Sequence, residues 1–558
     1  MAFVITQPCC NDASCTEVCP VDCIHPTPDE RAFKSTEMLY IDPETCIDCG
    51  LCVDACPVEA IFRDDDLPEA MARYSKINAD YFEGVELEDF EPAPSLKFPK
   101  TDQDPFRVAI VGSGPSGFYA ARELLAFKRS GIEVDMFDRL PTPWGLVRAG
   151  VAPDHPETKA VTDLFAEVSR RPGFRLHLNV EVGKHITHED LLAHHHAVIY
   201  AVGAPSDRHL GIPGEELPGS LAATEFVAWY NGHPDYADHS FDLTGSRAVI
   251  VGNGNVALDV ARLLVVDPDV LAKTDMAEHA VEALRSSAIE EVVLLGRRGP
   301  AQAAFTCPEL LALGRLPDVD IIVDPAELEL DEVSAAEVGA NPAKRLKLEI
   351  LREYAARPSA GHRKRIVLRF LVSPVEVQGA DHVTGLLVAR NEMVAGEDGA
   401  LRARSTEQTE LLETGLVLRS VGYRGVPVAD LPFDEQRGTI SNIGGRVTEV
   451  GTDVPVPGTY TAGWIKRGPS GVIGTNRQCA HDTIALILED LAADRLNPPK
   501  GDREALTTLL ADRAPEELDW AGWKLIDARE RELGKAAGRP RVKMLDIVEM
   551  VSLGRSKS

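Results

Sequence analysis

Nine of the eleven cysteines in this 558-residue chain lie within its first 56 residues. Four of them form the run CIDCGLCVDACP, in which Cys46, Cys49, Cys52 and Cys56 are spaced C-x2-C-x2-C-x3-C and followed by proline. With this spacing, three thiolates bind one iron–sulfur cluster and the fourth, before proline, binds another. Zinc also binds paired cysteines, but soft thiolates in the complete run favour iron–sulfur clusters. The run therefore predicts a domain that holds two clusters.

The preceding cysteines form an imperfect copy of this run. Counting back from Cys19-Pro20 places Cys15, Asp12 and Cys9 at the positions of the other three ligands. An aspartate thus stands where a cysteine would complete the set. We predict two sites: a first cysteine site of Cys9, Cys15 and Cys56, and a second cysteine site of Cys19, Cys46, Cys49 and Cys52, which binds a 4Fe–4S cluster.

The ligands of the first cysteine site suggest its cluster type. With three thiolates it is predicted to be 3Fe–4S, unless Asp12 or another group supplies a fourth ligand and completes a 4Fe–4S cluster. Cys10 and Cys23 are out of register and are predicted to be bystanders. Over its first 63 residues the chain resembles the seven-iron bacterial ferredoxins, through AFVIT, CPVDC and IDPETCIDCGLCVDACPVEAIF. The stretch between Cys9 and Cys15 is shorter than in those ferredoxins.

Charge and hydropathy argue against several other classes of protein. The net charge is −30, and residues 1–100 hold 21 acidic and 7 basic residues. Such a surface repels nucleic acid and suits either a basic protein partner or a solvated, soluble carrier. The chain has no apolar run of the roughly 18 residues that span a membrane, and its first residues lack the features of a signal peptide. We therefore expect a cytoplasmic protein that binds neither nucleic acid nor membrane.

From Phe106 onward, predicted strands and helices alternate, which indicates parallel α/β domains. The first glycine fingerprint, Gly112-x-Gly114-x-x-Gly117, stands between the strand-like VAIV and a helical segment. The glycines of this fingerprint permit a tight turn and let a pyrophosphate approach the N-terminus of the helix closely. Asp138 follows 21 residues after Gly117, at the end of the next predicted strand, where an acid binds ribose hydroxyls. This combination predicts a dinucleotide site.

A second fingerprint, Gly252-x-Gly254-x-x-Ala257, indicates a second nucleotide site. The strand predicted after it ends in Arg297-Arg298 instead of an acid. Adjacent guanidinium groups can bind a 2′-phosphate, which selects NADP over NAD. Two ordinary surface cations are the alternative, and their place at a strand end favours the phosphate-binding interpretation.

Residues 106–558 resemble the adrenodoxin-reductase family of ferredoxin–NADP reductases. The resemblance rests on LPTPWGLVRAGVAPDH, GNGNVALDVAR, GRRGPAQAAFT, RSVGYRGVP and AGWIKRGPSGVIGTN. The whole chain is similar to mycobacterial-type fusions of ferredoxin with ferredoxin–NADP reductase. The implied fold is an α+β ferredoxin domain followed by an α/β two-nucleotide-binding flavoprotein of the glutathione-reductase-like, Rossmann type.

The resemblance also implies roles for individual residues. Contacts to FAD are implied for Ser116, Asp138, Leu146 and Val182, with Trp464 beside the flavin and Gly471, Val472 and Ile473 covering it. Contacts to NADPH are implied for Asn253, Gly254, Asn255, Val256, Arg297, Arg298 and Glu309, with Gly471 near the nicotinamide. His155 and Asp259 match a polar pair near the flavin and are the candidate catalytic residues, although a helix-cap or packing role is the alternative for His155.

The implied domains are a ferredoxin domain (1–63), an acidic and proline-rich linker with room for one short helix but no core (64–105), an FAD-binding domain (106–205 and, with a C-terminal tail, 455–558) and an NADPH-binding domain (206–454). Between the expected FAD-binding strands, the histidines 194–196 are predicted to lie in a solvated turn and not at a metal site.

The expected activity is that of a ferredoxin–NADP(+) reductase, EC 1.18.1.2 type. FAD would accept a hydride from NADPH and release single electrons to the clusters. A downstream acceptor protein follows, for which a cytochrome P450 and a separate ferredoxin are candidates. Two alternatives stay open: a subunit that feeds another enzyme, as in the glutamate-synthase small subunit, and a non-enzymatic iron–sulfur sensor on an inactive reductase. The intact glycines, Asp138 and the arginine pair argue against the sensor.

Overall fold

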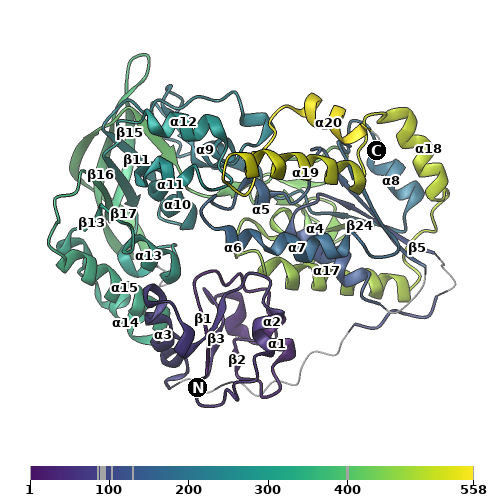
Figure 1. Cartoon of the computed structure of the whole chain (residues 1–558), viewed down its shortest axis with the longest axis horizontal. Helices are drawn as coiled ribbons and strands as arrows, with labels where there is room; N and C mark the ends of the chain where they lie inside the picture. Colours follow the sequence, from purple (N-terminus) through teal and green to yellow (C-terminus); the bar gives the residue numbers. More distant parts are fainter. Residues whose placement is uncertain are drawn as a thin grey trace.

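The computed structural model describes residues 2–84, 87, 96–101, 105–127, 131–396 and 401–556. These residues form a small cysteine-rich module and two larger domains, each built on a parallel sheet (Figure 1). The module, purple in Figure 1, lies beside both larger domains, at the bottom of the view. Across the described ranges, no helix is long and apolar enough to cross a membrane.

The module consists of two antiparallel strand pairs and two short helices: β1 (Phe3–Ile5) with β4 (Ile61–Arg63), β2 (Ile24–His25) with β3 (Tyr40–Ile41), α1 (Ser14–Val18) and α2 (Leu51–Ala55). The two helices end at Cys19 and Cys56, each followed by proline. A residue before proline is driven out of the helical conformation, and both cysteines have extended backbone. Each thiol is thereby turned away from its own helix.

A third helix of the module replaces part of the expected tether. After the 3-10 turns η1 (Arg31–Lys34), η2 (Asp64–Asp66) and η3 (Glu69–Met71), α3 (Arg73–Phe82) follows. Tyr74 and Ile77 of α3 are buried in the same apolar core as β1 and β3. The Asn78 amide oxygen accepts the N–H groups of Ile5 (3.1 Å) and Ile41 (2.9 Å). This corrects the expectation that 64–105 forms no core, because α3 satisfies backbone groups of the module's strands.

The first large domain is built on a seven-stranded sheet in the order β22-β23-β24-β8-β5-β6-β7. Its strands are β5 (Phe106–Val111), β6 (Ile132–Asp138), β7 (Phe174–Leu178), β8 (Ala197–Tyr200), β22 (Asn442–Ile443), β23 (Arg446–Thr448) and β24 (Pro455–Thr461). Every residue of β5 is buried, as expected for a parallel strand covered on both faces. The antiparallel β22 and β23 extend the edge of this sheet, although residues 206–454 were assigned to the other domain.

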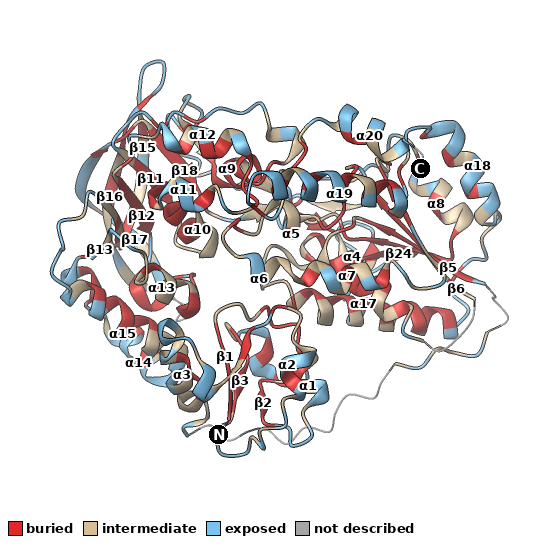
Figure 2. Ribbon diagram, viewed as in Figure 1, coloured by how far each residue is buried: buried red, intermediate tan, exposed pale blue. Residues whose placement is uncertain are grey.

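Helices cover both faces of this sheet (Figure 2). One face packs on α4 (Pro115–Leu124), α7 (Val161–Val168), α17 (Thr475–Ala492), α19 (Trp520–Ala536) and α20 (Ile547–Arg555). The other face packs on α8 (His188–His194) and α18 (Arg503–Arg513). The short α5 (Leu146–Ala149), α6 (Pro156–Lys159) and α16 (Trp464–Arg467) belong to the loops at the C-terminal ends of the strands.

The second large domain has a six-stranded parallel sheet in the order β10-β18-β11-β12-β14-β13. Its strands are β10 (Ser220–Ala222), β11 (Arg247–Val251), β12 (Glu291–Gly296), β13 (Val319–Val323), β14 (Lys364–Phe370) and β18 (Leu416–Arg419). One face packs on helices that include α9 (Ala223–Tyr230), α10 (Asn255–Val265), α12 (Glu278–Arg285), α13 (Cys307–Leu313), α14 (Glu332–Ala340) and α15 (Pro342–Ala356). The other face packs on the antiparallel sheet of β15 (Val372–Gly379), β16 (Val383–Ala395) and β17 (Leu401–Glu413).

Short elements complete the larger domains. These are the pair β9 (Ser206–Asp207) and β19 (Tyr423–Arg424), the pair β20 (Phe433–Asp434) and β21 (Thr439–Ile440), α11 (Pro268–Leu271), η4 (Pro234–Tyr236), η5 (Pro300–Gln302) and η6 (Pro325–Leu328). The pair β9 and β19 is antiparallel and joins the two chain segments that flank the second domain's sheet.

The expectation of a solvated turn at the histidines 194–196 is wrong for two of the three. His195 and His196 are 1% and 4% exposed. His195 Nε2 lies 3.2 Å from the fully buried Asp135 carboxylate, and the N–H of Arg107 donates to His196 Nδ1. His177 contacts the same carboxylate, and although burial opposes its charge, Asp135 and Glu517 raise the pKa of His177 to about 9. His177, His195 and Arg503 thus all contact the buried Asp135 carboxylate, a grouping that local sequence does not reveal.

Candidate iron–sulfur and nucleotide sites

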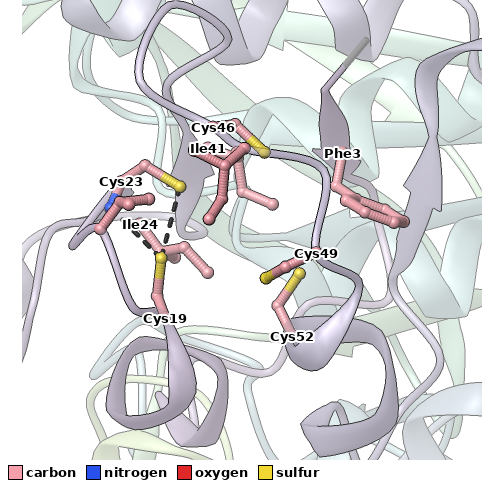
Figure 3. A pocket seen from close by; sticks show the side chains of 10 residues that line it. Phe3, Cys19, Cys23, Ile24, Ile41, Cys46, Cys49 and Cys52 are labelled. Carbon is pink, nitrogen blue, oxygen red and sulfur yellow. Dashed lines mark hydrogen bonds between the residues drawn. The ribbon is translucent and has the colours of Figure 1, made fainter.

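The second cysteine site is one cavity at the outer end of the module. Cys19, Cys46, Cys49 and Cys52 line it together with apolar side chains that include Phe3, Ile24 and Ile41 (Figure 3). Cys19 comes from the C-terminal end of α1, and Cys52 comes from α2. The structure therefore brings together the four thiols that the spacing assigned to one cluster.

Cys23, predicted to be a bystander, lines the same cavity. Its Sγ lies 3.4 Å from the Cys19 Sγ, and its backbone N–H donates to that sulfur at 3.4 Å (Figure 3). The spacing argument missed this proximity because Cys23 stands outside the C-x2-C-x2-C-x3-C register. Its position makes it a neighbour of the second cysteine site and a donor to one ligand sulfur.

The first cysteine site is a separate cavity on the side of the module that faces the larger domains. Cys9, Cys15 and Cys56 line it, and Cys10 and Asp12 line it too. The N–H of Ala60 donates to the Cys56 sulfur at 3.3 Å. Cys10 also belongs to the apolar core of the first large domain, together with Val58. Cys10 thus serves the contact between the module and that domain.

Asp12, the candidate fourth ligand, is engaged elsewhere. One carboxylate oxygen accepts the N–H of Ser14 at 3.0 Å, and the other accepts the Ser14 hydroxyl at 2.7 Å. These bonds begin helix α1, because an aspartate two residues upstream can satisfy free backbone donors at a helix start. The Asp12 carboxylate would have to leave Ser14 before it could bind iron with both oxygens.

The chemistry of both cysteine sites fits iron–sulfur clusters. All the predicted ligands are thiols, which suit soft metal centres. Burial raises the pKa of Cys52 to about 12 and that of Cys15 well above its ordinary value. Such thiols stay protonated at neutral pH unless a bound metal displaces the proton. Cys15 and Cys52 would therefore become thiolates only as ligands of a bound cluster.

The first glycine loop joins β5 to α4 and is built for close backbone approach. Gly112 has a φ of +107°, and a Cβ there would overlap the carbonyl oxygen of Ala201, which directly follows the neighbouring strand β8. Asp138 ends β6, where its carboxylate accepts the N–H groups of Ser113 (2.9 Å) and Leu140 (3.0 Å). The loop and the acid therefore lie side by side, as a pyrophosphate and an adjoining ribose require. Gly114 is the N-cap of α4, and Gly117 lies in its first turns.

The segment 463–477 closes over the start of α4. Ser116 Oγ donates to the Asn476 side chain at 2.9 Å, which ties α4 to α17. Trp464 begins α16, and its ring lies 5.1 Å from that of Tyr423.

The other residues expected at the flavin lie on separate loops. Leu146 begins α5 and is 38% exposed, whereas Val182 is partly buried. The stretch of Gly471, Val472 and Ile473 follows α16 and is open to solvent or half-buried.

Arg467, at the end of α16, has a guanidinium group whose hydrogen-bonding capacity is only partly used by the described residues. Its Nε and Nη1 atoms are buried and make no hydrogen bond with any described residue, although Nη2 donates to Ser470 and Asn476. Burial lowers the pKa of this guanidinium. A buried cation with free donors fits an anionic group beside the glycine loop. Sequence reasoning missed Arg467, whose only signal was its place within the AGWIKRGPSGVIGTN motif.

The second glycine loop joins β11 to α10 at Gly252, Asn253 and Gly254. The Asn253 carbonyl accepts the N–H of Phe305 at 2.9 Å, and the Asn255 side chain accepts that of Thr306 at 2.8 Å. These bonds fix the loop to the segment that leads into α13 and Glu309. The following Val256 is half-buried against the domain core.

Arg297 and Arg298 follow directly after β12 and are both exposed. Their backbone carbonyls are held by Asn391 and Leu371. Neither guanidinium makes a hydrogen bond or an ion pair with the residues that the structure describes. Two free cations at the C-terminal edge of a parallel sheet form a suitable site for a phosphate.

His155, Asp259 and Glu309 converge between the two large domains. One ligand atom from each lies within 4.8 Å of those of the other two. His155 occupies the N-cap position of α6 without capping it through its side chain, so the helix-cap alternative is not supported. Arg262 pairs with Asp259 at 2.5 Å and also with Asp154. Burial raises the pKa of Asp259 to about 7 and lowers that of Arg262 to about 10, shifts that this ion pair opposes.

The module contacts both larger domains beside these sites. On the second domain, Gln7 donates to Glu309 at 3.4 Å, and Glu37 accepts the N–H of Cys307 at 2.6 Å. On the first domain, the N–H of Gly474 donates to the Cys10 carbonyl at 2.7 Å. A Cβ at Gly474 would overlap the backbone of residues 11 and 12, so these two segments of the chain touch backbone to backbone. The first cysteine site therefore lies beside the segment expected to cover the flavin.

Arg477 strengthens the contact with the first domain. Its guanidinium donates to the Asp12 carbonyl at 2.8 Å and to the Ser14 hydroxyl at 3.4 Å, and it pairs with Glu17. Gln7, Gly474 and Arg477 were not singled out by sequence reasoning, because contacts between residues hundreds of positions apart leave no local pattern.

Comparisons with known proteins agree with this architecture. The 4Fe-4S binding domain family matches residues 39–62, and the pyridine nucleotide-disulphide oxidoreductase family matches residues 106–293. A probable ferredoxin/ferredoxin–NADP reductase of Mycobacterium tuberculosis is 48% identical over 568 residues, which cover 100% of this chain and 95% of the relative. A Mycobacterium leprae protein of the same description is 46% identical over 560 residues, or 99% of this chain and 98% of that one.

A solved structure supports the fold of the larger part. Mycobacterium tuberculosis FprA in complex with NADPH is 49% identical, with a TM-score of 0.76 over 81% of this chain and 99% of that chain. Fold and sites together define a two-domain oxidoreductase that binds dinucleotides and carries an iron–sulfur module. The chain belongs to the ferredoxin/ferredoxin–NADP reductase family.

The register of the first cysteine site can be tested by substitution. We expect Cys9→Ser to lose the cluster of the first cysteine site, and Cys10→Ser to keep both clusters because Cys10 packs in the interface. Asp12→Cys should supply a fourth thiolate and yield 4Fe–4S there. Iron and sulfide content with low-temperature EPR of each aerobically isolated variant is the measurement. Loss of the cluster in Cys10→Ser but not in Cys9→Ser would show that the register is wrong.

Coenzyme choice can be tested at the arginine pair. Replacing Arg297 and Arg298 by Ala should raise the KM for NADPH roughly a hundredfold, because two charged hydrogen bonds of about 1.5 kcal/mol each are lost. The KM for NADH should change little, since NADH lacks the 2′-phosphate. Steady-state kinetics with ferricyanide as acceptor measures both. Equal effects on the two coenzymes would contradict the assignment.

Proposed function

We propose that this chain is an NADPH–ferredoxin oxidoreductase that passes electrons from NADPH through FAD to its own iron–sulfur module and on to an acceptor protein. The observation that carries the proposal is the contact between the cysteine loop at Cys10 and the flavin-side segment at Gly474. A redox module placed there needs no diffusional search, because it already lies at the nucleotide sites.

Each of the two glycine loops binds one of the two nucleotides. The loop at Gly112 and the acid Asp138 bind FAD, with Arg467 offering free donors to an anionic part of it. The loop at Gly252 binds NADPH, and the exposed arginine pair after β12 holds its 2′-phosphate. When bound, FAD supplies the conversion between a two-electron hydride donor and one-electron acceptors.

The polar cluster between the domains orients the nicotinamide end of NADPH. His155 and Asp259 come from different domains, so their convergence depends on how the domains are arranged. Arg262 pairs with both Asp259 and Asp154 and weakens the repulsion between their carboxylates. Glu309 connects this cluster to the module through Gln7.

We propose two clusters of different type in the module. The second cysteine site has four thiols in register and suits 4Fe–4S. The first has three, and Ser14 holds both oxygens of Asp12, which favours 3Fe–4S. The final acceptor is a protein that takes one electron at a time, and a cytochrome P450 and a separate ferredoxin remain the candidates.

Arg477→Glu tests whether the observed contact is the one through which electrons pass. Reversing this charge removes the bond to the Asp12 carbonyl and repels Glu17. Loss of a charged hydrogen bond of about 1.5 kcal/mol predicts a roughly tenfold slower reduction of the clusters by NADPH. Stopped-flow absorbance under anaerobic conditions measures this rate, and ferricyanide reduction reports on the flavin reaction alone.

Arg437→Glu is the matched control, because this arginine is exposed and its side chain makes no hydrogen bond or ion pair with the described residues of the module. It carries the same change of charge and should leave the rate of cluster reduction unaltered. If Arg477→Glu also leaves that rate unaltered, electrons do not pass through the observed contact. If neither variant nor the wild-type chain oxidises NADPH with ferricyanide, the proposed function itself fails.

A further inference from the structure

The second cysteine site opens to solvent through an apolar surface. Val21 and Ile47 line its cavity and are still 37% and 57% exposed, and Cys49 itself is exposed. Leu51 and Val53, on either side of Cys52, are 48% and 37% exposed. We call Val18, Val21, Ile47, Leu51 and Val53 the apolar rim. Exposed apolar side chains that gather at one site mark an interaction surface.

Acidic residues surround the apolar rim. Residues 14–25 and 42–59, which carry it, contain seven Asp and Glu residues and no Lys or Arg. Asp22, Glu44 and Asp54 are exposed. None of these three forms a salt bridge with a residue in the described part of the chain. Glu17 and Asp48 pair with Arg477 and Arg63, so the uncompensated negative charge beside the apolar rim includes that of Asp22, Glu44 and Asp54.

The first cysteine site, in contrast, is covered by the first large domain. Val58 and Ala60, which follow Cys56, are each 1% exposed and belong to the apolar core of the first large domain. The adjoining loop is held by Gly474 and Arg477. One end of the module is therefore covered by the reductase. At the other end, no residue of the described part of the two larger domains lines the cavity of the second cysteine site.

We propose that the acceptor protein docks on the apolar rim and its acidic surround, so that electrons leave through the second cysteine site while the module stays docked. This inference rests on the proposed function. Each docking event passes one electron to the acceptor. One NADPH serves two such events, giving NADP+, one proton and two reduced acceptors.

The chemistry of the rim defines the partner. Its docking face has an apolar centre around its own redox group and a ring of Lys or Arg side chains that complement Asp22, Glu44 and Asp54. The small apolar area fits a transient electron-transfer contact, which lies below about 1,200 Å² of buried surface. Association should be fast and strongly dependent on salt, because opposite charges steer the encounter.

Mitochondrial cytochrome c, a one-electron acceptor with lysines around its haem edge, is a suitable probe. We expect Asp22→Asn/Asp54→Asn to lower its second-order rate of reduction by roughly three- to tenfold at about 20 mM ionic strength, and the difference to vanish near 0.5 M salt. The control pair Asp381→Asn/Asp453→Asn removes two exposed charges elsewhere and should have no such effect. Ferricyanide reduction and iron content should be the same in all variants.

The apolar part is tested separately. Leu51→Ser should slow cytochrome c reduction at high salt as well, whereas Val454→Ser, at a residue 59% exposed and outside the module, should not. Carbodiimide cross-linking with mapping by mass spectrometry gives a readout independent of turnover. Cross-links from cytochrome c lysines to Asp22, Glu44 or Asp54 support the proposal.

Three outcomes would overturn the proposal. Cross-links found only on residues 106–556 would place the acceptor on the reductase. Unchanged cytochrome c kinetics in both rim variants would show that the rim is not used. Self-association of the chain that Leu51→Ser abolishes, seen by sedimentation, would assign the rim to a second copy. If NADPH oxidation with ferricyanide is absent, the proposed function fails, whereas the cross-linking still reports on the docking surface.

Discussion

The contact between the cysteine loop and the N-terminal end of α17 is the constraint on which the rest of the structure depends. The Gly474 N–H binds the Cys10 carbonyl, and glycine is required there because any side chain would meet the loop backbone. Arg477 adds the bond to the Asp12 carbonyl. Because this loop also carries ligands of the first cysteine site, the position of that site relative to the flavin segment is set by a few backbone contacts.

The same docking reaches the second domain. Gln7 contacts Glu309, and Glu37 binds the N–H of Cys307 and pairs with the buried Lys347 at 3.3 Å. Polar pairs at the edge of an interface add little affinity but fix orientation and discriminate against other geometries. The module thus contacts both domains whose relative position brings His155 and Asp259 together. The position of the module is thereby fixed relative to the site where the two nucleotides would meet.

Local sequence patterns predicted much of this molecule. The fold class was predictable because strands, glycine loops and helices alternate, and it agrees with the family matches. The grouping of the cysteines into two cavities followed from spacing, since proline after Cys19 and Cys56 turns each away from its own helix.

What the sequence could not reveal depends on long-range contacts. Asn78 makes α3 part of the module's core by binding strands 37 and 73 residues away. His195, at the end of α8, is buried beside Asp135 of β6, which lies 60 positions away in the sequence. Arg477 and Asp12 are separated by 465 positions, and no periodicity or motif links them.

The central claim is that electrons reach the clusters within one chain. Anaerobic stopped-flow mixing of the protein with saturating NADPH, at protein concentrations spanning about a tenfold range, tests it directly. If the docked arrangement carries the electrons, the observed rate constant of cluster reduction is independent of protein concentration, as for a tethered partner already in place. A rate constant that rises in proportion to protein concentration would show that reductase and module meet between different chains, and would contradict the account.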